Sequence, residues 1–191
     1  INPKISNLAS GLSTFPKPPD QSQNQNLRVT VSEKIKLSNN ILKLKLKSIN
    51  GQLPTFHAGA HIDIKLQSGL IRQYSLTNGP GETDHYSIAI KIEKNEKSGS
   101  KIISKNVSIG DLLAISSPHN NFPLLRNSNH IVFIAGGIGI TPILSMTKVM
   151  SSMQLSFELH HFTRSIDSLA FQQELKNFTK NTTTYTDLSI D

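Results

Sequence analysis

The 191-residue chain contains no cysteine and no tryptophan, and aromatic residues make up only 6% of it. Without cysteine, these residues hold no disulfide framework, thiol nucleophile, zinc–cysteine site or cysteine-ligated iron–sulfur cluster. The sequence also lacks any run close to the ~20 apolar residues of a membrane-spanning helix. No basic segment followed by an apolar stretch opens it, as a signal peptide would require. We therefore expect a cytoplasmic protein with no membrane partner.

Acidic residues are few, with 13 Asp and Glu against 20 Lys and Arg, which gives a net charge of +7. Such a balance suits nucleic acid, acidic lipid, an acidic protein or a phosphorylated small molecule. The basic residues are scattered, however, and too few aromatic rings are present to stack single-stranded bases. We predict that nucleic acid is not a partner.

Histidine is common, with seven in the chain, but no metal-ligand spacing joins them. Gly59 separates His57 from His61, which argues against one helix presenting both. His160 and His161 are adjacent within an expected strand and therefore face opposite sides of it. We predict no metal site. A serine hydrolase is also disfavoured, because Ser75 lies in no G-x-S-x-G elbow.

Three segments differ in pattern along the chain. Residues 1–26 are rich in proline, serine and amides, which predicts a flexible N-terminal extension. Residues 27–125 contain short alternating segments separated by turn formers, and this predicts a six-stranded antiparallel barrel or sandwich. The expected strands are 27–31, 41–47, 59–66, 72–76, 86–92 and 111–115. Within 41–47, leucines alternate with lysines, as in a strand with one solvent-exposed face.

Residues 126–191 alternate between strand and helix patterns, which predicts a parallel α/β sheet. The apolar run 130–135 is typical of a strand buried on both faces. A glycine-rich turn follows it, and then Thr141 is expected to cap a helix that has Pro142 at its first position. A strand at 157–162, a helix at 169–178 and a strand at 182–190 are expected next.

Three local segments have residues that could bind a ligand, although each also has an ordinary structural explanation. The turn at 136–141 offers free amides at a helix N-terminus to a dinucleotide pyrophosphate, or is simply a tight turn. Pro142 stands where a G-x-G-x-x-G motif would have its last glycine. Arg72, Tyr74 and Ser75 offer a phosphate fork, a flat ring and a small hydroxyl, or belong to an ordinary barrel strand. Residues 97–101 form an anion site or a surface loop.

Taken together and in order, these segments resemble the ferredoxin–NADP reductase superfamily. Within it, they are most similar to the group of phthalate dioxygenase reductases and vanillate O-demethylase reductases. The resemblance runs from about residue 27 to the end of the chain. The segments that carry it stand in the family's order and spacing, and they are 57–63, 72–78, 99–101, 117–124, 135–142 and 161–165.

The resemblance implies a flavin-dependent oxidoreductase with an FMN-binding barrel at 27–125 and a nucleotide-binding domain at 126–191. Electrons would pass from NADH, or alternatively NADPH, through FMN rather than FAD to an iron–sulfur centre of a Rieske-type oxygenase system. The site residues that it implies fall into five groups. They are Arg72, Gly99 and Ser100 at the flavin phosphate; Tyr74, Ser75, Leu76 and Thr77 along the flavin ring, with Ser75 at the reactive nitrogen as the catalytic residue; Ile90 and Lys91 at the ring edge; Gly137, Gly139 and Thr141 at the nicotinamide nucleotide; and Arg164 and Ser165 at the adenosine ribose or phosphate.

Two features of the family are missing from this sequence. Family members continue to a C-G-P segment and then to a ferredoxin-like domain with four cysteines, whereas this sequence stops at Asp191. We expect a truncated piece of a longer reductase, with an incomplete nucleotide-binding domain and the [2Fe–2S] cluster in a missing C-terminal domain. The alternatives are a flavin-binding module whose degenerate nucleotide domain supports no turnover, and a β-barrel adaptor without a cofactor.

Overall fold

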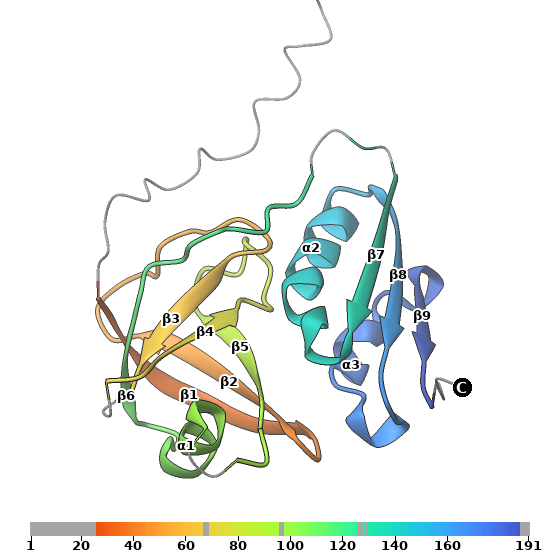
Figure 1. Ribbon diagram of the computed structural model, residues 1–191. Coiled ribbons are helices and arrows are strands. Elements are labelled where there is room, and N and C mark those ends of the chain that lie inside the picture. Colours follow the sequence, from red (N-terminus) through yellow and green to blue (C-terminus); the bar gives the residue numbers. More distant parts are fainter. Residues whose placement is uncertain (1–25, 67–68, 96–97, 126–127, 129, 188–191) are drawn as a thin grey trace, which may run out of the picture.

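The computed structural model describes residues 26–66, 69–95, 98–125, 128 and 130–187, which form two β-sheets (Figure 1). The first is six-stranded, in the order β4-β3-β6-β1-β2-β5, and the second is three-stranded, in the order β7-β8-β9. The strands are β1 Leu27–Ser38, β2 Ile41–Ser48, β3 His61–Lys65, β4 Ile71–Ser75, β5 Tyr86–Lys91, β6 Leu112–Ile115, β7 His130–Gly136, β8 Ser156–Phe162 and β9 Thr182–Tyr185. The helices are α1 Gly99–Asn106, α2 Ile140–Ser152 and α3 Gln172–Lys176, with short 3-10 turns at Gly137–Gly139, Ile166–Ser168 and Thr179–Asn181.

The first sheet is antiparallel throughout and curls into a barrel, as the alternating pattern predicts. An antiparallel bridge between Leu76 and Ile88 joins its two ends, and the Thr77 amide donates to the Ser87 carbonyl at 2.8 Å beside it. Strand β1 is longer than expected because its first part pairs with β6 while the whole strand lies along β2. Leu44 and Leu46 point into the barrel and are fully buried. The interior is therefore filled with side chains.

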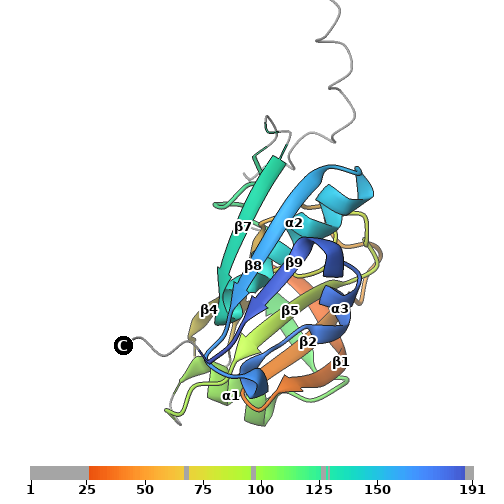
Figure 2. The same ribbon diagram turned by 90° about the vertical axis from the view of Figure 1, so that its right-hand side faces the viewer.

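The second sheet is parallel, and α2 and α3 lie between it and the barrel (Figures 1 and 2). Phe133 and Ala135 of β7 point toward the helices and are buried. Val132 and Ile134 point the other way, with 52% and 71% of their surface exposed. The expectation that this strand is buried on both faces is therefore wrong for the residues that the structure describes, because both helices cover the same face.

The start of α2 also differs from expectation. The 3-10 turn at Gly137–Gly139 runs directly into the helix, so Gly139 occupies the cap position and Thr141 lies within the first turn. The Thr141 hydroxyl donates to the Ile138 carbonyl at 2.9 Å instead of accepting from the helix amides. Thr141 is consequently a buried residue of the turn and not the helix cap.

The last helix is shorter than the predicted 169–178. Phe171 has a left-handed backbone with φ 62°, which interrupts a right-handed helix, so α3 covers only Gln172–Lys176. The side chain of Phe171 is buried in the apolar cluster beneath the helices. Strand β9 ends at Tyr185, and residues 188–190 of the expected strand lie outside the described residues, as does most of the expected N-terminal extension.

The two sheets share an apolar cluster. Ile41, Ala58 and Ala89 of the barrel pack with residues of α2, α3, β7 and β8. In the described ranges, no helix is long and apolar enough to cross a membrane. The same residues contain no group of three or more histidine and acidic side chains arranged to hold a metal ion.

Candidate functional site

A guanidinium lies across the first turn of α1. A Cβ atom added to Gly99 would lie 2.6 Å from Arg72 Nε, so only a residue without a side chain lets the arginine take this position. Arg72 Nη1 also donates to the Ile71 carbonyl at 2.9 Å. The arginine cation therefore lies beside the positive N-terminal end of the helix, and both favour an anion there.

Two buried serine hydroxyls, those of Ser98 and Ser100, lie at the same helix start. Ser98 caps α1, with its Oγ accepting from the Lys101 amide at 3.2 Å. Ser100 Oγ accepts from the Glu93 amide at 3.1 Å and lies 3.1 Å from Ser98 Oγ. The loop that leads out of β5 and the start of α1 are thus fixed to each other, and residues 98–101 form a capped helix start next to Arg72.

Tyr74 lies beside this arginine on the same face of β4. In the β3–β4 pairing, Arg72 is opposite Ile64 and Tyr74 is opposite Ile62, so both share the core-facing side, while Ser75 is opposite His61 on the other side. Burial raises the pKa of Tyr74 to about 12, although the Arg72 cation opposes this. Tyr74 therefore presents a neutral, half-buried ring whose inner edge packs on the barrel core.

The residues expected along the ring and at its edge occupy different environments. Leu76 is fully buried and forms part of the bridge that closes the barrel, and Thr77 is buried with its hydroxyl donating to the Ser87 carbonyl at 3.2 Å. Ile90 is fully buried near the end of β5, whereas Lys91 is exposed. Strand β5 and the turn at 137–139 lie against each other, so the barrel and the glycine turn meet here.

The glycine turn is held by a histidine that the sequence analysis treated only as a strand residue. Gly137 has φ +50°, which favours glycine, and its carbonyl lies 3.1 Å from His161 Nε2. His161 is buried, and its Nδ1 has no hydrogen-bond partner among the described residues. Burial lowers the pKa of His161, so the ring is neutral and Nε2 donates. Alternation in the expected strand predicted only that His160 and His161 face opposite sides, and gave neither the buried one nor the carbonyl that it contacts.

Arg164 and Ser165 follow β8 at the same edge of the parallel sheet as the glycine turn that follows β7. Arg164 is exposed, and Ser165 Oγ lies 3.1 Å from Ser168 Oγ. Beside them, the rings of Phe162 and Tyr185 stack at 4.5 Å. The expected residues thus form two groups, one at β4 and α1 and one at the carboxyl edge of the second sheet, and β5 lies between them.

A closed antiparallel barrel followed by a parallel unit with a glycine turn is the fold of the ferredoxin–NADP reductase type. Residues 26–123 match the family model described as the oxidoreductase FAD-binding domain. The chain belongs to this family. Sequence and structure comparisons both support this assignment.

Among curated proteins, the chain is 41% identical over 147 residues to the phthalate 4,5-dioxygenase oxygenase reductase subunit of Pseudomonas putida, covering 76% of this chain and 45% of that protein. It is 42% identical over 151 residues to the vanillate O-demethylase oxidoreductase of Acinetobacter baylyi, covering 78% and 48%. A solved phthalate dioxygenase reductase, described as a modular structure for electron transfer from pyridine nucleotides to [2Fe–2S], superposes with a TM-score of 0.81 at 34% identity, covering 85% of this chain and 52% of that one. The chain thus spans about half the length of these relatives.

Proposed function

We propose that this chain is the flavin-binding and nucleotide-binding part of an oxygenase reductase. In this role it accepts electrons from NADH, or alternatively NADPH, on bound FMN and passes them toward an iron–sulfur centre that serves a terminal oxygenase. The relatives named above are reductase components of such systems or act in demethylation, which supports the class of reaction. The observation that carries the proposal is the contact of Arg72 with Gly99 at the start of α1.

The residue types at this corner are those that hold a phosphate in proteins. The space above Gly99 is shaped by the absence of a Cβ, and Arg72 lies across it with the amides of α1 beneath. Arginine and helix amides together bind phosphate through charge-assisted hydrogen bonds. We assign Arg72, Gly99 and Ser100 to the phosphate and Tyr74 to the flavin ring. We assign FMN and not the FAD named in the family model, because the resemblance includes no added loop for the adenosine half of FAD.

The remaining assignments follow the path from the phosphate to the second sheet. Ser75 would offer its hydroxyl near the reactive nitrogen, and the main chain of Ile90 and Lys91 would contact the ring edge. Gly137, Gly139 and Thr141 would hold the nicotinamide nucleotide, with Arg164 and Ser165 at its adenosine end. When bound, the flavin supplies an acceptor for two electrons that releases them singly. The protein's share is positioning, since hydride transfer depends on distance and angle.

Cofactor analysis of the purified chain tests this proposal. We expect a yellow protein whose released flavin has the mass of FMN, and whose flavin absorbance bleaches on anaerobic mixing with NADH. Bound FAD would contradict the FMN assignment, and a colourless chain that ignores added FMN would indicate the cofactor-free adaptor. A flavin that binds but stays oxidised with both NADH and NADPH would indicate a binding module without turnover.

A further inference from the structure

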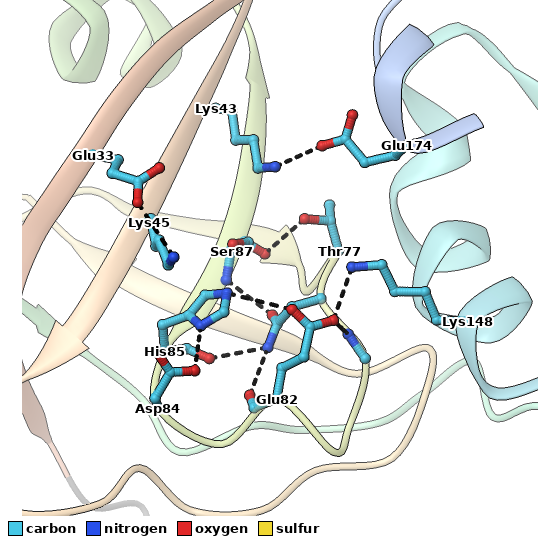
Figure 3. Close-up of polar contacts among 12 residues, drawn as sticks. Glu33, Lys43, Lys45, Thr77, Glu82, Asp84, His85, Ser87, Lys148 and Glu174 are labelled. Carbon is cyan, nitrogen blue, oxygen red and sulfur yellow. Dashed lines mark hydrogen bonds and ion pairs between the residues drawn. The ribbon is translucent and has the colours of Figure 1, made fainter. Parts of the chain in front are cut away.

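Two ion pairs cross from the barrel to the helices of the second sheet (Figure 3). Lys148 of α2 lies 2.9 Å from Glu82, which belongs to the loop between β4 and β5. Lys43 of β2 lies 2.6 Å from Glu174 of α3. Because the two pairs involve different helices and different parts of the barrel, together they restrict rotation of the helices against the barrel.

The Glu82 carboxylate has partners in its own loop as well as Lys148. Its Oε1 accepts from the Gly79 amide at 2.7 Å as well as from Lys148 Nζ, and its Oε2 lies 3.7 Å from His85 Nε2. Although burial alone would raise it, the Gly79 amide and Lys148 together hold the pKa of Glu82 below its usual value. The carboxylate is therefore ionised and fixed in direction at neutral pH.

The loop that carries Glu82 is itself attached to the strands of the flavin site. Asn78 Nδ2 donates to the carbonyls of Glu82 and His85, at 3.1 and 3.0 Å, and Asn78 Oδ1 accepts from the Ser87 amide at 2.9 Å. This loop begins directly after the segment Arg72–Thr77 and ends at β5. The position of Glu82 is thus fixed relative to β4 and β5, the two strands that border the proposed flavin site.

On the other side of the contact, Lys148 belongs to the helix that directly follows the glycine turn. It lies seven residues after Thr141, which places both on one face of α2 two turns apart. Its aliphatic stem packs against Gly79, where an added Cβ would be 3.6 Å from Lys148 Cβ and Cδ. Since a helix is stiff, fixing Lys148 fixes the direction from which the turn at 137–139 approaches β5.

We propose that the Glu82–Lys148 contact is a positioning contact that sets the nicotinamide-binding turn against the flavin site. This inference rests on the proposed function, in which hydride transfer needs both groups at a defined distance. A half-exposed ion pair contributes little to stability. Its effect is therefore on geometry, while the shared apolar cluster keeps the two units together.

A double-mutant cycle tests the contact. Lys148→Met removes the charge and Lys148→Arg keeps it, and both put a good helix former in α2. Glu82→Gln removes the opposite charge and keeps an acceptor for the Gly79 amide. Hydrogen exchange of the 137–143 amides is the first readout. We expect about fivefold faster exchange in Lys148→Met, near wild-type exchange in Lys148→Arg, and no added effect of Lys148→Met in the Glu82→Gln background.

The barrel provides a matched control pair. Lys45 lies 3.2 Å from Glu33, and the two are exposed to 25% and 47%, close to the 29% and 43% of Lys148 and Glu82. This pair joins β1 to β2 and does not cross to the helices (Figure 3). Lys45→Met is expected to leave exchange at 137–143 unchanged. An equal effect of Lys45→Met and Lys148→Met would overturn the proposal.

The second readout is catalytic geometry in the flavin-loaded chain. We expect Lys148→Met to slow flavin reduction by NADH about tenfold and to weaken the long-wavelength charge-transfer absorbance, with FMN affinity within about twofold of wild type. Parallel loss of FMN affinity, or unchanged exchange at 137–143, would contradict the positioning role. If the wild-type chain binds no flavin, the proposed function fails, and the exchange cycle still decides whether this contact positions the turn.

Discussion

The barrel and the parallel sheet bury their apolar surfaces in different ways. The barrel closes on itself through the bridge between Leu76 and Ile88. Its core contains buried residues of β1, β2, β3, β5 and β6, and Tyr74 of β4 packs against them. The parallel sheet is covered on one face, and its helices complete their core with Ile41, Ala58 and Ala89 of the barrel. The barrel is therefore a self-contained platform for a cofactor, whereas the second unit takes its position from the barrel.

The largest effect is expected at Gly59, which lies close to the barrel's own Phe122 and to Met146 of α2. Gly59 has φ +93°, and an added Cβ would lie 1.9 Å from the Phe122 carbonyl oxygen and 2.8 Å from Met146 Cε. We predict that Gly59→Ala lowers the free energy of unfolding by about 4 kcal/mol, since neither backbone can yield cheaply. Urea denaturation followed by circular dichroism measures this loss.

Gly51 is the matched control for this substitution. It has φ +77° and no atom within 4 Å of an added Cβ, so Gly51→Ala carries the backbone strain without the collision. We expect a loss of about 1 kcal/mol there. Equal losses at Gly51 and Gly59 would show that the close approach of Phe122 and Met146 to Gly59 is not a constraint on the fold.

The two faces of β7 provide the next test, because neighbouring residues point to a covered and an uncovered side. Phe133 is 7% exposed and stacks edge-on with Phe157, while Ile134 is 71% exposed. Phe133→Ala is expected to destabilise by about 3 kcal/mol and Ile134→Ala by about 0.5 kcal/mol or less. Thermal unfolding of both variants checks this contrast, and a large loss at Ile134 would contradict a one-sided sheet in this chain.

Flavin affinity should depend on the barrel corner and not on charge in general. Arg72→Gln is expected to weaken FMN binding about 100-fold, because a hydrogen bond to a charged group is worth about 1.5–3 kcal/mol. Arg28→Gln on the exposed side of β1 removes the same charge elsewhere and is expected to leave affinity unchanged. Fluorescence titration with FMN separates the two. Similar weakening by both variants would exclude Arg72 as the phosphate ligand.

The smallest effect concerns pH and His161 in the second unit. Burial lowers the pKa of His161 in the folded chain below its unfolded value of 6.5. The folded state therefore takes up its proton at lower pH than the unfolded state, and stability is lost as pH falls from about 6.5 toward the folded pKa. His161→Gln keeps a donor for Gly137 and is expected to flatten this part of the pH profile. Denaturation midpoints between pH 7.5 and 5.5 test this, and an unchanged slope would contradict it.

Much of the barrel could be predicted because its signals are local, whereas the assignment of a flavin phosphate to Arg72, Gly99 and Ser100 came from the family resemblance. Alternating leucines and lysines in β2 identify its inner face without knowledge of its neighbours. The shared face of Arg72 and Tyr74 also follows from the alternation of side chains along a strand. The second unit was predicted less well. The left-handed Phe171, the uncapped start of α2 and the exposed face of β7 depend on what packs against each segment.

The sequence by itself determined that this chain has six short antiparallel strands, in a barrel or a sandwich, followed by a parallel unit, because side-chain periodicity and glycine-rich turns act over a few residues. It also determined the residue types available for phosphate and nucleotide binding. Only the tertiary structure decided that Arg72 lies across Gly99, that His161 holds Gly137 and that Glu82 meets Lys148. Each of these contacts joins residues about 24 or more positions apart, where local periodicity carries no information about distance.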